Sequence, residues 1–158
     1  MILRKYKAAD CDDLSALFFE TVHAVNAKDY TEEQLFAWAN GADVLKVRSD
    51  DLIKQNTLIA ELDGRIIGFG SIDGTGYLDL LFVHKHYQRQ GVATALCNAL
   101  EKGFAKVTVH SSITAKPFFE NRGYRVEEAR CAVRGGVSLK NFKMIKYFTA
   151  DDSRGKQN

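Results

Sequence analysis

The run from Tyr77 to Leu96 constrains the fold of this chain more than any other segment. It opens with a mostly apolar stretch, 77–83, that predicts a buried strand, and continues through a polar turn into a helix that begins near Val92. The first amides of a helix have no internal partner, and the helix dipole adds partial positive charge there. Gly91 and Ala93 keep the side chains small, so a phosphate can approach the backbone. The run therefore predicts a binding site for a phosphate or pyrophosphate group.

Length and composition predict one domain with its own hydrophobic core. The chain has 158 residues, of which 46% are hydrophobic, and we expect a single domain over 1–149 and a polar, disordered tail over 150–158. The net charge of +2 comes from scattered Lys and Arg residues, which argues against a nucleic-acid partner. No apolar run approaches the roughly 20 residues that span a bilayer. We therefore expect no membrane partner.

The cysteines and histidines argue against a disulfide framework and against a metal site. Cys11, Cys97 and Cys131 are far apart and odd in number, which fits reduced thiols. The first residues also lack the apolar core of a signal peptide, so we expect a cytoplasmic protein. His84 and His86 have no cysteine or carboxylate beside them in the sequence, and a solvated turn is expected there without a metal.

Periodicity and turn residues place the remaining elements. The expected helices cover Asp12–Asn26, Thr31–Trp38 (opened by a capping box of Thr31 and Gln34), Val44–Ile53, Val92–Leu100 and Thr114–Arg122. The expected strands cover Ile2–Lys7, Thr57–Leu62, Arg65–Ile72, Tyr77–Val83, Lys106–His110, Tyr124–Val133 and Ser138–Phe148. This order is not the regular alternation of a doubly wound fold. It predicts an α/β (α+β) fold with a mixed, mostly antiparallel central sheet of about six or seven strands and helices on both faces.

Two motifs on these elements resemble the GNAT superfamily of N-acetyltransferases. Gln88–Ala93 reads QRQGVA and matches the family's Q/R-x-x-G-x-G/A loop, which binds the pyrophosphate of coenzyme A. Ala115–Tyr124 reads AKPFFENRGY and is similar to the family's A-x-x-F-Y-E-x-x-G-F segment. The strand before the loop and the final hairpin also resemble bacterial members. Rival phosphate motifs are absent, since neither G-x-x-x-x-G-K-[ST] nor an early G-x-G-x-x-G occurs.

The resemblance implies transfer of an acetyl group from acetyl-CoA to a primary amine, by direct attack in a ternary complex and without a metal. The acceptor would be a small-molecule or peptide amine, and relatives are often homodimers. The alternative is a non-catalytic module of the same fold that binds acyl-CoA as a sensor or in an interaction.

The resemblance also implies which residues hold coenzyme A. The amides from Gln90 to Thr94 are expected to bind the pyrophosphate, and the backbone of 81–83 to pair with the pantetheine arm in a gap between two diverging strands. One of these strand amides would polarise the thioester. The full set of expected cofactor contacts is Leu81, Phe82, Val83, Gln88, Arg89, Gln90, Gly91, Val92, Ala93, Thr94, Ser112 and Phe118.

Two residues are candidates for the general base. Asp79 is the only charge in its strand, and a two-residue period places it on the side of Leu81 and Val83. A carboxylate in partly apolar surroundings has a raised pKa, which suits a proton acceptor. The alternative is a structural carboxylate bonded to the backbone or to a neighbouring Arg. His110 is the second candidate, and its alternative is a core histidine.

The general acid departs from the family pattern. Many members place a Tyr where this chain has Phe119, which cannot donate a proton. Ser112 stands where many relatives carry Asn, and its hydroxyl is a candidate to bond the cofactor arm or to lie near the sulfur. Tyr124 is displaced from the family's Tyr position. A thiolate can leave without a dedicated acid, so activity does not depend on one.

The acceptor site is expected beside the first helix. Phe19, His23 and Asn26 project from its second side and could line a substrate cleft, with Tyr30 and Trp38 at the border. The alternatives are that Phe19 packs on the next helix or on a second subunit and that Trp38 belongs to the core.

Overall fold

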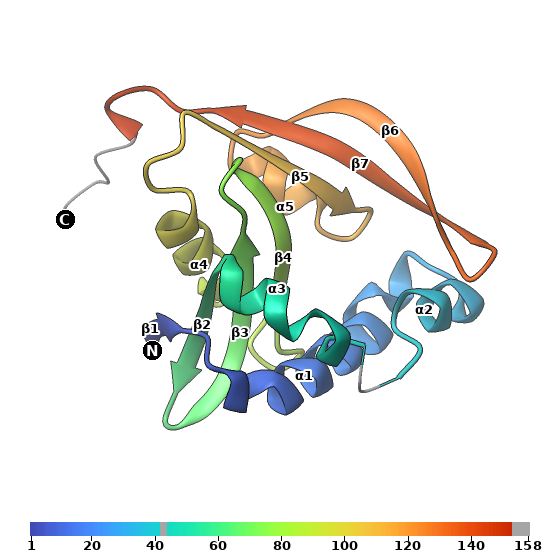
Figure 1. The fold of residues 1–158 in the computed structure, drawn as a ribbon. Coiled ribbons are helices and arrows are strands. Elements are labelled where there is room, and N and C mark those ends of the chain that lie inside the picture. The colour runs from blue at the N-terminus through green and yellow to red at the C-terminus, as the bar shows by residue number, and fades with distance from the viewer. Residues whose placement is uncertain (42–43, 153–158) are drawn as a thin grey trace.

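A seven-stranded sheet organises the computed structural model, which describes residues 1–41 and 44–152 (Figure 1). The strands are β1 (Ile2–Lys5), β2 (Asn56–Leu62), β3 (Arg65–Ile72), β4 (Tyr77–Val83), β5 (Lys106–Ser112), β6 (Arg125–Arg134) and β7 (Val137–Tyr147). They lie in the order β1-β2-β3-β4-β5-β7-β6, and β4 with β5 is the parallel pair among otherwise antiparallel neighbours in the described chain. The predicted mixed, mostly antiparallel sheet is therefore confirmed.

Helices cover both faces of the sheet, as expected. They are α1 (Cys11–Val25), α2 (Glu32–Trp38), α3 (Ser49–Lys54), α4 (Val92–Leu100) and α5 (Lys116–Asn121), with 3-10 turns η1 (Ala8–Asp10), η2 (Asn26–Lys28) and η3 (Lys46–Arg48). The predicted capping box opens α2, because Thr31 Oγ1 accepts from the Gln34 amide at 3.2 Å and Gln34 Oε1 accepts from the Thr31 amide at 2.9 Å. The single helix expected over Val44–Ile53 is wrong. Arg48 adopts φ −107° and ψ 9°, which separates η3 from α3.

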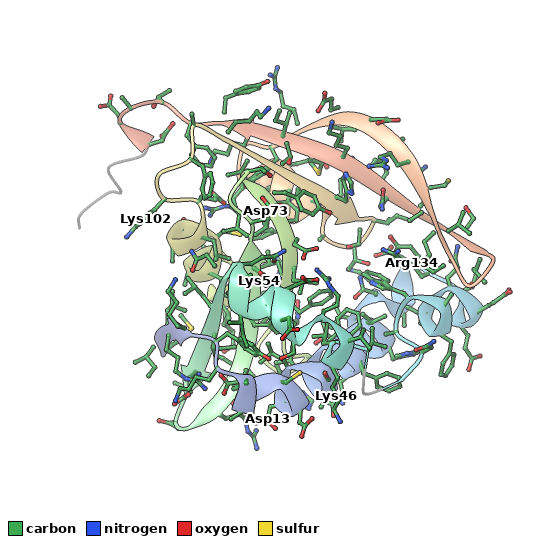
Figure 2. All side chains as sticks on the ribbon, in the orientation of Figure 1. Asp13, Lys46, Lys54, Asp73, Lys102 and Arg134 are labelled. Carbon is green, nitrogen blue, oxygen red and sulfur yellow. The ribbon has the colours of Figure 1, made fainter. Side chains whose placement is uncertain are left out.

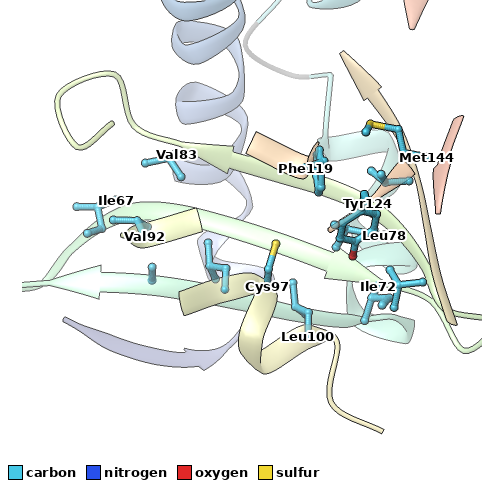
Figure 3. Packing of buried hydrophobic residues seen from close by; sticks show 14 residues of the cluster. Ile67, Ile72, Leu78, Val83, Val92, Cys97, Leu100, Phe119, Tyr124 and Met144 are labelled. Atoms are coloured by element: carbon cyan, nitrogen blue, oxygen red, sulfur yellow. The ribbon is translucent and has the colours of Figure 1, made fainter. Parts of the chain in front are cut away.

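One face of the sheet packs against α4 and α5 (Figure 3). Gly68 and Gly70 of β3 allow α4 to come close, since a Cβ on Gly68 would lie 2.9 Å from Val92 Cγ1. A Cβ on Gly70 would lie 2.7 Å from Leu100 Cδ1. Real side chains do not tolerate such distances, so these two glycines set the separation between α4 and the sheet.

The other face packs against α1, α2 and α3. The apolar stripe predicted for the first helix is buried there, with Leu14 and Val22 fully enclosed and Val25 partly exposed. Sheet residues such as Phe69 and Leu139 complete this second cluster. The helix positions follow from the 3.6-residue period of apolar side chains.

Two hairpins connect neighbouring strands toward opposite ends of the sheet order. The β2–β3 hairpin turns through Asp63 and Gly64, both with positive φ (51° and 77°), as the sequence predicted. β6 and β7 form a long hairpin that extends over α2 (Figure 1).

The expected tail over 150–158 lies outside the described residues from position 153 onward. Among residues 1–41 and 44–152, none of the helices has the length and apolarity that a bilayer crossing requires.

Candidate active site

A cleft opens where β4 and β5 separate. The two strands pair only through Tyr77 with Thr108 and Leu78 with Val109, and then diverge. The resulting cleft has a volume of about 1510 Å³ and runs from the loop before α4 to α1, α2 and the β6–β7 hairpin. The gap expected between two parallel strands is present in the structure.

The backbone of β4 offers hydrogen-bond donors to this cleft. The His84 amide donates to the Ile67 carbonyl of β3 at 2.8 Å, and in an antiparallel pair every second residue bonds to the same neighbour. Phe82 therefore bonds toward β3, where its carbonyl lies close to Gly68. Leu81 and Val83 then direct their backbone groups to the opposite side, where β5 has moved away.

Because of this register, only two of the three residues at 81–83 can have the backbone role that the sequence predicted for all three. Leu81 and Val83 remain placed for it, whereas the Phe82 backbone belongs to the β3 ladder and its ring lines the cleft. The Val83 carbonyl already accepts from Gln88 Nε2 at 2.6 Å and from Thr21 Oγ1 at 3.2 Å. The free donors on this edge are thus the amides of Leu81 and Val83.

The loop before α4 has the backbone of an anion site. Arg89 and Gly91 both have positive φ, at 58° and 84°, and Gly91 is the N-cap of α4. Its carbonyl accepts from the Ala95 amide at 3.0 Å, and no side chain in the described residues caps the helix. The amides that follow Gly91 therefore keep their donors available. A Cβ on Gly91 would meet nothing within 4 Å, so the space beside it is open.

Two glutamines of the loop have structural partners. Gln88 Nε2 bonds to Val83, as described above, and Gln90 Nε2 donates to the His86 carbonyl at 3.2 Å. Both bonds hold the loop in shape. Of the expected coenzyme A contacts, Gln90 does not line the cleft, and the others do: Leu81, Phe82, Val83, Gln88, Arg89, Gly91, Val92, Ala93, Thr94, Ser112 and Phe118.

Asp79 does not lie on the side that the two-residue period predicted. Ser71 pairs with Leu80 and Ile72 with Leu78, so Asp79 is the extra residue of a β-bulge. A bulge reverses the alternation of side chains. Leu81 and Val83 accordingly pack toward α4, while Asp79 forms an ion pair with Arg48 on the other face. The alternative role, a carboxylate bonded to a neighbouring Arg, describes the observed contact.

His110 lines the cleft between two polar partners. Arg130 donates to His110 Nε2 at 2.7 Å, so the single proton of a neutral imidazole lies on Nδ1 and faces the Tyr77 hydroxyl at 3.2 Å. Burial and the nearby charges of Arg130 and Lys143 lower the pKa of His110 below 6.5. Burial and the Asp79 carboxylate raise the pKa of Tyr77. The pair is neutral near pH 7. The residue as a whole is exposed, so His110 is not a core histidine, although its imidazole is partly desolvated.

The residues considered for the acid have distinct environments. Ser112 lines the cleft, and its Oγ accepts from the Ala115 amide at 3.0 Å, which shapes the start of α5. Phe119 is buried at 2% exposure beside Phe118 and Tyr124. The Tyr124 hydroxyl donates to Glu101 at 3.2 Å, and burial raises its pKa. Tyr124 lies outside the cleft lining and is structural.

The expected acceptor residues divide into two groups. Phe19 and His23 do not line the cleft. Their rings lie 4.3 Å apart, and His23 contacts Phe36 of α2 at 4.6 Å, so Phe19 and His23 form a packing contact with the next helix. Asn26 and Tyr30 do line the cleft.

Tyr30 joins three elements around the cleft. Its hydroxyl donates to the Lys140 carbonyl at 2.7 Å and accepts from the Ile113 amide at 2.9 Å. Trp38 also lines the cleft and packs edge-on against Tyr30 at 5.5 Å.

Sequence reasoning missed Arg48, Arg130 and Tyr77, because only the fold brings them to Asp79 and His110.

The comparisons with known proteins identify the family. A model described as an acetyltransferase (GNAT) domain matches residues 26–146. The chain belongs to the GNAT acetyltransferase family. Among curated proteins it is 37% identical over 135 residues to the uncharacterized N-acetyltransferase YafP of Escherichia coli K12, which covers 84% of this chain and 87% of YafP.

Solved GNAT structures share the fold. A GCN5-related N-acetyltransferase from Rhodopseudomonas palustris superimposes with a TM-score of 0.89 and 37% identity, covering 93% of this chain and 95% of that one. The PaiA N-acetyltransferase from Thermoplasma acidophilum, solved with coenzyme A, gives a TM-score of 0.76 and 19% identity over 93% and 98% of the two chains. This GNAT chain is thus an acetyltransferase of a family that uses coenzyme A as co-substrate.

Proposed function

We propose that this protein moves an acetyl group from acetyl-CoA directly to a primary amine while both substrates occupy the cleft. The observation that carries the proposal is the separation of β4 from β5 after two residue pairs. It lies next to the N-terminus of α4 at Val92, where Gly91 is the N-cap and no side chain of the described residues caps the helix. A diphosphate needs the amides of that helix, and an extended amide-bearing arm needs the open edge of a strand. Both are walls of one cleft.

The residues of the chain then take separate roles. The amides of Val92, Ala93 and Thr94 would bind the pyrophosphate, with Arg89 supplying positive charge beside them. The amides of Leu81 and Val83 would bind the pantetheine arm and polarise the acetyl carbonyl. Gln88 and Gln90 hold the loop rather than the ligand.

Acetyl-CoA supplies an activated acetyl thioester. The amine nitrogen bonds to the acetyl carbon as the carbon–sulfur bond breaks, and the coenzyme leaves as a thiolate. We assign removal of the amine proton to the Nε2 lone pair of the neutral His110, directly or through water, because its lowered pKa keeps it unprotonated near pH 7. Nε2 takes this proton as its hydrogen bond from Arg130 breaks. Asp79 is assigned a structural role through Arg48.

Thiol release from acetyl-CoA tests the proposal. Purified protein should bind coenzyme A in calorimetry and release thiol when a panel of amines is added, with mass spectrometry detecting a gain of one acetyl group. Coenzyme A binding without release for any amine would instead support the acyl-CoA-binding module, which the buried Phe119 at the family's Tyr position favours. No binding of coenzyme A would contradict both functions.

A further inference from the structure

The side chains that line the cleft are unequal in charge. Among the described lining residues the cations are Lys28, Arg48, Arg89, Arg130, Arg134 and Lys140, and the carboxylate is Asp79. The whole chain, by contrast, has 22 basic and 20 acidic residues. The net positive charge of the chain is therefore concentrated at the cleft.

Only part of this charge is assigned a role by the proposed function. Arg48 is neutralised by Asp79, and Arg89 belongs to the phosphate loop. Lys140 lies over the Phe142 ring at 5.4 Å. Lys28, Arg130 and Arg134 remain, and none of the three forms an ion pair with a carboxylate in the described parts of the chain. We call these three residues the cationic wall.

The register of the last hairpin directs the cationic wall toward the acceptor end of the cleft. Arg130 and Arg134 lie on the same side of β6 as Ala132, which pairs with Leu139. Leu139 packs in the cluster with α1 and α2, so this side of the hairpin faces those helices. Lys28 follows α1 in η2. Figure 2 shows Arg134 near α2, at the far end of the molecule from α4.

One acidic residue shares this side of β6 without lining the cleft. Glu128 pairs in register with Lys143, and it lies beyond the lining residues. It contributes to the surroundings of His110, whose pKa it raises by less than Arg130 and Lys143 lower it. At His110 the positive charges of Arg130 and Lys143 therefore outweigh the Glu128 carboxylate.

We propose that the acceptor amine also carries an anionic group, a carboxylate or a phosphate, that the cationic wall binds. This inference rests on the proposed function and names the class of its acceptor. A cleft lined by one sign of charge concentrates ligands of the opposite sign, and guanidinium groups bind carboxylate and phosphate through paired hydrogen bonds. The same positive charges would repel a polyamine. The rings of Trp38 and Phe82 supply apolar surface for the rest of the acceptor.

Matched acceptors test this inference. Thiol release would be measured for phenylalanine against phenylalaninamide, for O-phosphoethanolamine against ethanolamine, and for spermidine. Each anionic amine should show a kcat/KM roughly tenfold or more above its uncharged partner, because one charge-assisted contact contributes at least that factor. Phenylalaninamide has the less basic amine, so a larger fraction of it is neutral at a given pH. Amine basicity alone would therefore favour phenylalaninamide over phenylalanine and cannot produce the expected order. The comparison of the first two pairs separates carboxylate from phosphate recognition.

Variants assign the effect to the cationic wall. Arg134→Gln and Lys28→Gln should raise KM for the preferred anionic amine by roughly tenfold while kcat and the affinity for coenzyme A stay near wild type. Arg125→Gln is the matched control, because Arg125 is also exposed on β6 but does not line the cleft. Arg134→Glu should shift the preference toward uncharged and cationic amines.

The outcomes separate this inference from the proposed function. Equal kcat/KM for the anionic amines and their uncharged partners, or a higher kcat/KM for spermidine, overturns the inference and leaves the proposed acetyl transfer unaffected. An equal loss in Arg134→Gln and Arg125→Gln also overturns it. Coenzyme A binding with no turnover on any amine overturns the proposed function and this inference with it.

Discussion

Arg48 of η3 and Asp79 of β4 form an ion pair across the edge of the cleft, between a 3-10 turn and the extra residue of a β-bulge. The carboxylate is only 14% exposed, so it would lack solvation if Arg48 were removed. The pair fixes the bulge and ties β4 to the segment before α3. In the sequence Asp79 resembles a catalytic residue because it is the only charge in an otherwise apolar strand, and the ion pair with Arg48 accounts for that charge.

Substitutions of this pair should reveal a structural role. Asp79→Asn and Arg48→Gln should each lower the free energy of unfolding by about 1–3 kcal/mol, and the double variant by less than the sum, because either change breaks the same contact. Turnover at a temperature where all variants are folded should fall to a similar extent in both single variants. A loss of turnover confined to Asp79→Asn would identify the carboxylate as the base.

Gly91 should affect ligand affinity more than stability. A side chain at φ 84° costs about 1–2 kcal/mol, and it would project into open space where we place the diphosphate. Gly91→Val should therefore weaken coenzyme A binding in calorimetry by roughly tenfold or more. Gly64→Val is the control, since Gly64 has φ 77° and equally open surroundings but lies in the β2–β3 hairpin. Similar coenzyme A affinities in the two variants would contradict the loop assignment.

The rate should depend on pH through His110. Its pKa lies below 6.5 because of burial first and Arg130 second, so the base stays neutral down to that range. With an acceptor whose amine is itself unprotonated there, activity should fall only below the pKa of His110. Arg130→Gln removes a neighbouring positive charge. Without that charge the imidazolium form of His110 is more stable, so the pKa of His110 rises. The acid limb of kcat/KM for an uncharged amine should then move up by about half to one pH unit. An unmoved limb, with Arg125→Gln as control, would exclude His110 as the titrating group.

The buried ion pair between α4 and the end of α5 should dominate stability. Arg122 donates to both oxygens of Glu101 at 3.0 Å, and Tyr124 donates to the same carboxylate. Glu101→Gln leaves Arg122 without its counter-ion and should cost about 3–5 kcal/mol. Glu120→Gln, which breaks the exposed pair with Lys116, should cost about 0.5 kcal/mol. Equal melting temperatures in the two variants would show that the Glu101 network is dispensable.

The sequence predicts most of the elements, because their signals are local. Asp63 with Gly64 specifies a hairpin, and Thr31 with Gln34 specifies a helix start, within four residues in each case. The loop around Gly91 is predictable for the same reason. The loop motif Gln88–Ala93, together with Ala115–Tyr124, carries the resemblance to the GNAT family, which the comparisons confirm.

The side-chain environment of the site depends on contacts that no local pattern encodes. The bulge at Asp79 comes from the register with β3, and a strict alternation placed the carboxylate on the wrong face. Helical spacing places Phe19 and His23 on the side of α1 expected to line the cleft, but α2 packs against them through Phe36. Arg130 of β6 meets His110 of β5 across the intervening strand β7, and the two residues are 20 positions apart in the chain.

The glycines of β3 have an effect beyond the strand that contains them. Gly68 lies beneath Val92, the first residue after the N-cap of α4, so the missing methyl group at position 68 sets how close to the sheet that helix end lies, where we place the diphosphate. An alanine there would lift the helix start by tenths of an ångström and re-aim its amides. We therefore expect the affinity for a ligand at this end of the cleft to depend partly on an atom that is absent from the sheet beneath the helix.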